Sequence, residues 1–242
     1  MSTERQSIDV RGTPVEVVRK DIKNLHVGVY PPTGRVRVAA PLRLTDEAVR
    51  LAIISRLGWI HRRQAEFKQQ DRQSQREFVT GEGHYFFGRR YRLDLSERDG
   101  PSTVRRVNNA RMELRVRPGA DLAKREAVLQ AWYRGRLREL LPPLLAKWEG
   151  KVGVKVSEVR IKRMKTRWGS CNAEARRIWL NLELAKKPPA CLEYILVHEM
   201  VHLIERHHTD QFRQYMDRSM PQWRLHRDEL NRAPLSHENW SY

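Results

Sequence analysis

The chain has 242 residues, with 47 Lys and Arg against 29 Asp and Glu, and its formal net charge is +18. This length suits one large domain or two small ones, and no stretch approaches the roughly 18 consecutive apolar residues of a spanning helix. Because no apolar segment follows the first residues and only two cysteines occur, we expect neither a secretory signal nor a disulfide framework. We therefore expect a cytoplasmic protein with reduced thiols and no membrane contact.

The excess of positive charge bears on the partners of the protein rather than on its fold. It favours phosphate-rich partners such as DNA, RNA or nucleotides. The basic residues are dispersed along the chain, however, and no motif for reading a groove or a base is visible. Two interpretations stay open at this point: a surface that contacts nucleic acid or nucleotides, and a charged surface that only keeps the protein soluble.

The first third of the chain predicts a small sheet followed by a helix. Residues 8–41 alternate between apolar and polar residues, as strands do, and a Pro-Pro-Thr-Gly turn interrupts them at 31–34. Thr45 is a suitable N-cap for a helix that runs to about Gln70. The residues at helical spacing that we expect on one side of this helix are Leu51, Ile54, Leu57 and either Ile60 or His61.

The middle of the chain predicts two hairpins and a long helix. One hairpin spans Tyr85–Leu93 and turns at Gly88, and the next spans Thr103–Val116 and turns at Asn108-Asn109. A helix should then run from Asp121 to about Glu149, with Pro142-Pro143 kinking or splitting it. Residues 1–120 are therefore expected to form a β-rich region with one helix, which either stands apart from residues 121–242 or packs with them as one unit.

Two strands and a helix are predicted in the last third. The strands are Val156–Ile161 and Arg177–Asn181, and a loop containing Trp168-Gly169-Ser170-Cys171 joins them. Pro188-Pro189 then precedes an uninterrupted helical pattern from Ala190 to about Arg206. The fold class expected from the whole pattern is α+β. Cys171 is expected to be a small buried thiol, although a role as a metal ligand or redox sensor is the alternative.

The predicted helix contains the string His198-Glu199-Met200-Val201-His202. Residues four apart share one face of a helix, so His198 and His202 can bind one ion. Zinc takes imidazole nitrogens as ligands, and Glu199 lies beside the pair, in position to accept a proton from water. Two histidines inside an otherwise apolar helix are costly unless something satisfies their ring nitrogens. The string therefore predicts a catalytic zinc site.

A catalytic zinc site needs a third protein ligand, and His207, His208 and Asp210 are the nearby candidates. His208 lies ten residues after His198, the offset of the third ligand in longer motifs of this kind, although Glu205 occupies their glycine position. Thr209 is a suitable N-cap for a following helix, which would hold His208 at a fixed corner. We expect His207 to be a solvated loop residue and Asp210 to cap that helix or to orient a ligand.

Several short motifs together resemble the YgjP-like metallopeptidase family and, more distantly, the SprT-like proteases of the zincin clan. The dense part of the match covers about residues 155–232, and a weaker part extends upstream. The resemblance implies a zincin-like core, zinc bound by His198, His202 and His208, and Glu199 as general base. The motifs that carry it are Met164-Lys165-Thr166-Arg167-Trp168-Gly169-Ser170-Cys171, Ile178-Trp179-Leu180-Asn181, Leu192-Glu193-Tyr194, His198-Glu199 through His208, and Met220-Pro221-Gln222-Trp223.

The function expected is that of a zinc metallopeptidase acting on peptide or protein substrates, with an edge strand holding the extended chain. Arg177–Asn181 is the candidate edge strand, although it could equally be a core strand. Arg167 and Tyr215 are candidate oxyanion donors that the sequence does not place. Two rivals remain. One is a metal-dependent nucleoside triphosphate pyrophosphohydrolase, although no Gly-rich phosphate loop occurs. The other is a basic nucleic-acid-associated protein with a structural zinc, which needs a fourth ligand from Cys171, His207 or Asp210.

Overall fold

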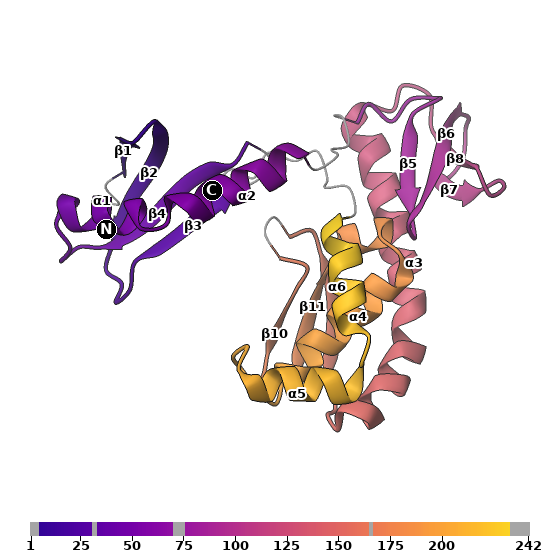
Figure 1. The fold of residues 1–242 in the computed structure, drawn as a ribbon. Helices are drawn as coiled ribbons and strands as arrows, with labels where there is room; N and C mark the ends of the chain where they lie inside the picture. Colours follow the sequence, from indigo (N-terminus) through magenta and orange to yellow (C-terminus); the bar gives the residue numbers. More distant parts are fainter. Residues whose placement is uncertain (1–4, 31–32, 70–75, 165–166, 233–242) are drawn as a thin grey trace. The chain divides into compact units, whose positions relative to one another are not determined.

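A computed structural model describes residues 5–30, 33–69, 76–164 and 167–232 (Figure 1). The contacts within the chain divide its described residues into two compact units, one before residue 70 and one from residue 76 onward. Each unit is described by itself. None of the helices among the described residues combines the length and the apolar character that crossing a membrane requires.

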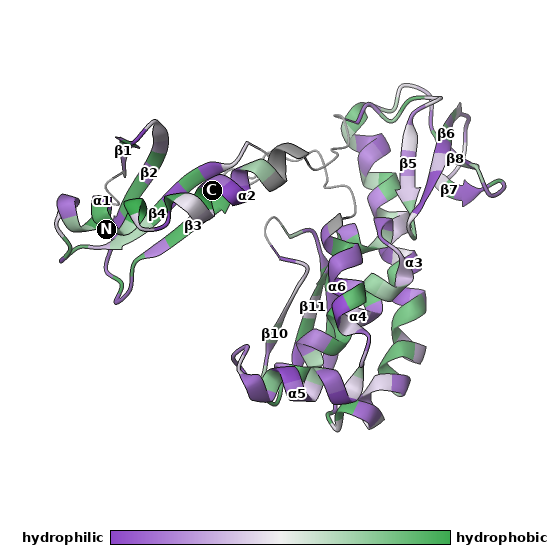
Figure 2. Ribbon diagram, in the orientation of Figure 1, coloured by the Kyte–Doolittle hydropathy of each residue, from purple (hydrophilic) through white to green (hydrophobic). Residues whose placement is uncertain are grey.

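The first unit contains a four-stranded sheet in the order β1-β2-β4-β3. Strands β2 and β4 pair in parallel at the centre, and each has an antiparallel neighbour on its outer side. Alternating burial along β2 and β4 places one face of the sheet in the core. Figure 2 shows the corresponding mixture of hydrophobic and hydrophilic residues along β4. The strands are β1 (Arg5–Val10), β2 (Thr13–Lys20), β3 (His26–Tyr30) and β4 (Arg35–Pro41).

Two helices follow this sheet where the sequence predicted one: α1 (Asp46–Ile54) and α2 (Leu57–Gln69). The predicted cap is confirmed, because Thr45 accepts a hydrogen bond from the Ala48 N–H. The side of the helix predicted from the apolar spacing is only partly buried, since Leu51 is 56% exposed. Two apolar stripes with helical spacing compete here, and packing against the sheet selects the one formed by Val49, Ile53, Leu57 and Ile60.

The second unit begins with a sheet that repeats the strand arrangement of the first, in the order β5-β6-β8-β7 with β6 and β8 parallel. Both predicted hairpins are confirmed. The first turns at Phe87 and Gly88, which both have positive φ, as a tight two-residue turn requires. The strands are β5 (Gly83–Phe86), β6 (Arg89–Glu97), β7 (Thr103–Arg106) and β8 (Arg111–Val116).

The long helix α3 (Leu122–Val152) begins at an Asp121 cap, which accepts from the Lys124 N–H, and ends at Gly153 with φ 79°. Pro142 and Pro143 lie inside it, so the predicted split does not occur. Both prolines are exposed, and the carbonyl groups that lose their helical donors can therefore bond to water. In Figure 2, hydrophilic and hydrophobic residues are interleaved along this helix.

The rest of the second unit is a three-stranded sheet, order β10-β11-β9, followed by helices. Its middle strand β11 pairs in parallel with β9 and antiparallel with β10. The segment that includes Gly169-Ser170-Cys171 was predicted as a loop, but it forms β10, because pairing with β11 compensates for the weak strand propensity of Gly, Ser and Asn. The elements are β9 (Glu158–Lys162), β10 (Gly169–Asn172), β11 (Arg177–Asn181), a 3₁₀ helix η1 (Leu182–Lys186), α4 (Pro189–Val201), α5 (Asp210–Ser219) and α6 (Trp223–Arg232).

One hydrophobic core runs through the second unit, from Phe78 to Leu230. Helix α3 packs against both the β5–β8 sheet and the helices that follow. Its Tyr133 stacks on Phe86 and donates a hydrogen bond of 2.7 Å to the Tyr85 carbonyl. The division between the units therefore lies before the β5–β8 sheet, earlier in the chain than the boundary expected near residue 120, because α3 joins that sheet to the rest.

Candidate metal centre and active site

Helix α4 carries His198 and Glu199 in the middle of the second unit, where it contacts α3, α5, α6 and the strands β10 and β11. Pro189 occupies its first turn, as predicted. The helix ends at Val201, and His202 is its C-cap residue, so the prediction that it continues to about Arg206 is wrong. The His202 N–H donates to the His198 carbonyl at 3.2 Å, and this last turn keeps the two rings on one side of α4.

The chain leaves α4 and returns through His208 at the start of α5. The predicted cap is confirmed, because Thr209 Oγ1 accepts a hydrogen bond from the Phe212 N–H at 3.3 Å. The buried ring of Phe212 lies 5.0 Å from His198, 4.6 Å from His202 and 4.8 Å from His208, between ring centroids. The Phe212 side chain on α5 therefore packs against all three imidazole rings.

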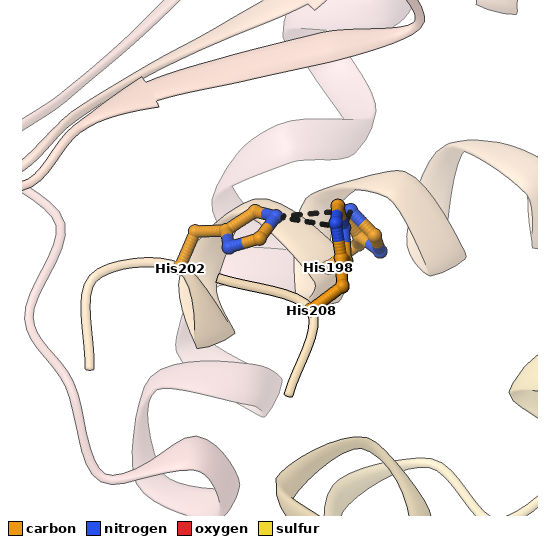
Figure 3. A group of neighbouring side chains, drawn as sticks. All are labelled: His198, His202 and His208. Carbon is orange, nitrogen blue, oxygen red and sulfur yellow. Dashed lines mark hydrogen bonds between the residues drawn. The ribbon is translucent and has the colours of Figure 1, made fainter. Parts of the chain in front are cut away.

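The three imidazoles direct their Nε2 atoms at one point, as Figure 3 shows. These atoms lie 3.2 Å apart between His198 and His202, 3.1 Å between His202 and His208, and 3.1 Å between His198 and His208. Nδ1 of His202 lies 3.0 Å from the Glu205 carbonyl oxygen, which can only accept, so Nδ1 carries the hydrogen and Nε2 presents a lone pair. Burial lowers the pKa of His198 to about 3, and it also lowers the pKa of His202.

Converging lone pairs on unprotonated rings repel one another unless a cation joins them, and neutral imidazole is a preferred ligand of zinc. Among the described residues, no further Asp, Glu, Cys or His joins this cluster, in which all ligand atoms lie within 4.8 Å of one another. His207, Asp210 and Cys171 therefore remain outside it. The donor set fits a metal ion with three protein ligands and an open position, the pattern of catalytic rather than structural sites.

The rings of His198 and His202 differ in the hydrogen bonding of Nδ1, the nitrogen that points away from the cluster. Ligand histidines usually donate the hydrogen on their other nitrogen, which fixes the orientation of the ring. His202 does so to the Glu205 carbonyl. Nδ1 of His198 is buried without a hydrogen-bond partner among the described residues, so packing against Tyr194 and Phe212 is what orients this ring.

The carboxyl group of Glu199 is buried beside the cluster, and the residue is only 6% exposed. Burial raises its pKa to about 8, and the positive charge of Arg167 opposes this shift. Strand β10 passes next to it at Gly169: a Cβ on Gly169 would lie 2.6 Å from Glu199 Oε1 and 2.7 Å from its Cγ. The lack of a side chain at Gly169 is therefore what lets the carboxyl group occupy its place.

We predict that Gly169→Ala lowers kcat by roughly a hundredfold, the order of loss that a displacement of about 1 Å produces at a reacting group. The zinc content should not change, because the atoms nearest to the added methyl group all belong to Glu199. The matched control is Gly150→Ala in α3, where a Cβ would meet nothing within 4 Å. Steady-state kinetics and metal analysis of both variants test this, and unchanged turnover in Gly169→Ala would contradict it.

The cluster and Glu199 lie in an open pocket with a volume of about 930 Å³. Cys171 is half-buried in its wall rather than fully buried as expected, and burial raises the pKa of its thiol to about 11. Arg167 lines the pocket and Tyr215 does not. The sequence pattern did not predict the other residues that line the pocket, because it could not show that α6 packs beside α4. These further lining residues include Tyr194, Ile195, Arg206, Arg227, Leu230 and Asn231.

A family model described as YgjP-like, metallopeptidase domain, matches residues 23–233. The chain therefore belongs to the YgjP-like metallopeptidase family, as its motifs indicated. One similar solved structure is the metallopeptidase zymogen abylysin of Pyrococcus abyssi, with 22% sequence identity and a TM-score of 0.34. That likeness covers 36% of this chain and 89% of the other. No curated protein sequence gives a significant match.

Proposed function

We propose that this protein is a zinc-dependent metalloendopeptidase in which His198, His202 and His208 hold the metal and Glu199 is the general base. The observation that carries the proposal is the convergence of the three Nε2 atoms, 3.1–3.2 Å apart, in the same pocket as a buried carboxyl group. Membership of a metallopeptidase family supports a metal-dependent hydrolase in general. A zincin-like core around α4 is part of the same proposal.

Zinc held by these histidines would act as a Lewis acid toward water and toward the scissile carbonyl group. The chain itself supplies the proton transfer: Glu199 takes a proton from the attacking water and gives it to the leaving amine nitrogen. Glu199 is only 6% exposed, so its carboxyl group is largely shielded from bulk water. Arg167 supplies positive charge close to it and remains a candidate for stabilising the oxyanion.

The substrate chain needs an edge strand beside the pocket, and β10 is the strand in that position. The sequence-based candidate, β11, is wrong because it lies between β9 and β10 and both of its sides are paired. Strand β10 has one neighbour among the described strands, and its residues Gly169 to Asn172 line the pocket. Its outward N–H and C=O groups are therefore available to an extended peptide.

The rival functions fit the described residues less well. A structural zinc normally has four protein ligands, and Cys171, His207 and Asp210, the residues considered for the fourth, all lie outside the cluster. A nucleoside triphosphate pyrophosphohydrolase would use the same metal, and the basic pocket wall is compatible with phosphate. The sequence nevertheless contains no Gly-rich phosphate loop. Nucleic-acid contact through the basic surface and a cytoplasmic location stay predictions.

A substrate screen tests the proposed function. The zinc-loaded protein, the chelated protein and the chelated protein with zinc restored are each incubated with unfolded casein, a peptide library and nucleoside triphosphates. We expect peptide-bond cleavage that disappears on chelation and returns with zinc. Cleavage of triphosphates in the absence of any peptide cleavage would contradict the proposed peptidase function and support the pyrophosphohydrolase function.

A further inference from the structure

Three arginine side chains line the pocket around the candidate metal centre. They come from three separate segments: Arg167 lies two residues before the start of β10, Arg206 lies between α4 and α5, and Arg227 lies on α6. All three are exposed to solvent. Since the three arginines lie on different segments of the chain, it is the fold that brings them together around this pocket.

The pocket contains little negative charge to balance these arginines. The carboxylic residues that line it are Glu199, which we assign to catalysis, and Glu174. Arg227 pairs with the neighbouring Asp228 at 3.0 Å and lies over the Trp223 ring. Within the described ranges, neither Arg167 nor Arg206 forms an ion pair with the chain. Both guanidinium groups are therefore available to an anionic partner.

Arg167 and Arg206 line the same pocket as the edge strand β10. Arg167 lies two residues before β10 begins at Gly169. Arg206 lines the same pocket as all four residues of β10. A strand advances about 3.3 Å per residue, so a peptide paired with these four residues stays within the pocket that both arginines line.

We propose that the pocket selects peptides with acidic side chains close to the scissile bond, with Arg167 and Arg206 as the residues that recognise them. This inference rests on the proposed peptidase function and names its substrate class. An acidic peptide fits better than a nucleotide because the charges line the same pocket as an unpaired strand edge, where a peptide can form backbone hydrogen bonds while its side chains meet the arginines. Guanidinium groups bind carboxylates through paired N–H donors.

Matched peptides test the proposal. A cleavage site is mapped by mass spectrometry in unfolded casein, and two quenched fluorescent peptides are made from it, with either Glu or Gln within three residues on both sides of the bond. For the wild-type protein we expect kcat/KM to be about tenfold higher with Glu, a difference of about 1.4 kcal/mol. The preference should decrease as the salt concentration rises.

Arg206→Gln should lower kcat/KM about fivefold more for the Glu peptide than for the Gln peptide, since an exposed ion pair contributes about 1 kcal/mol at most. The matched control is Arg138→Gln on α3, an exposed arginine that does not line this pocket and whose loss changes the net charge equally. Fluorescence anisotropy with the Glu199→Gln protein should show the same preference in binding, without turnover.

The outcomes separate the two proposals. Equal kcat/KM for both peptides, or a preference for Glu that Arg206→Gln and Arg138→Gln reduce alike, overturns the acidic specificity while the peptidase stands. A preference for Glu that Arg206→Gln alone reduces supports it. If neither peptide is cleaved and triphosphates are, the proposed function fails, and the inference about peptides fails with it.

Discussion

His202→Ala should remove the bound metal: zinc per chain is expected to fall from nearly one equivalent to nearly none after dialysis. The variant lacks one of three Nε2 atoms that lie 3.1–3.2 Å apart, and two imidazoles without the third hold zinc far more weakly. Metal analysis by mass spectrometry measures the loss. Since ligand binding stabilises the folded state by mass action, zinc should raise the melting temperature of the wild-type protein but not of His202→Ala.

The control for this prediction is His207→Ala, in the same loop and next to His208. His207 lies outside the cluster, and its described hydrogen bonds are made by its backbone alone: the N–H donates to Glu205 Oε1 and the carbonyl accepts from the Thr209 N–H, so this variant should keep its zinc. Equal zinc in the wild type and His202→Ala would remove the basis of the proposed site. A loss of zinc in Cys171→Ser or Asp210→Asn would indicate a fourth protein ligand and favour a structural metal.

Glu199→Gln should lower kcat/KM by about 10²–10⁴ while zinc stays bound, the range that general acid–base groups contribute. Gln has nearly the same shape as Glu, so it fits the space beside Gly169, but it cannot accept the proton of the attacking water. The barrier should therefore rise by about 3–5 kcal/mol. Turnover of a peptide substrate at matched zinc content measures the effect.

A suitable control is Glu139→Gln on α3, which removes one exposed carboxylate away from the pocket and should keep full activity. If Glu199→Gln kept wild-type turnover at matched zinc, Glu199 would not be the base, whatever the substrate. If Glu199→Gln lost zinc together with activity, the Glu199 carboxyl group would instead contribute to binding the metal.

Local signals in the sequence predicted several elements of the site correctly. The four-residue spacing of His198 and His202 predicted rings on one side of a helix, and the structure brings these rings together. Thr209 predicted the cap that begins α5 and returns His208 to the cluster. These predictions succeed because helix periodicity and capping depend on residues within a few positions of one another.

Other features depend on contacts between distant segments, and the sequence pattern missed them. Gly169-Ser170-Cys171-Asn172 has little strand propensity, and it forms the edge strand β10 only because β11 pairs with it. Two apolar stripes competed on α1, and the sheet selected one of them. The boundary between the units lies earlier in the chain than the one expected near residue 120, because Tyr133 on α3 packs against Phe86 of the preceding sheet.

The sequence alone identified the candidate residues of the proposed site: two histidines and a glutamate at helical spacing and a third histidine at a capped corner, in a strongly basic chain. The candidate substrate strand, the glycine that makes room for Glu199 and the arginines that line the pocket came only with the packed molecule. The difference is physical. Ligand type and helix phase are local properties of the chain, whereas a pocket wall is built from β10, α4 and α6, whose positions depend on a core that extends from Phe78 to Leu230.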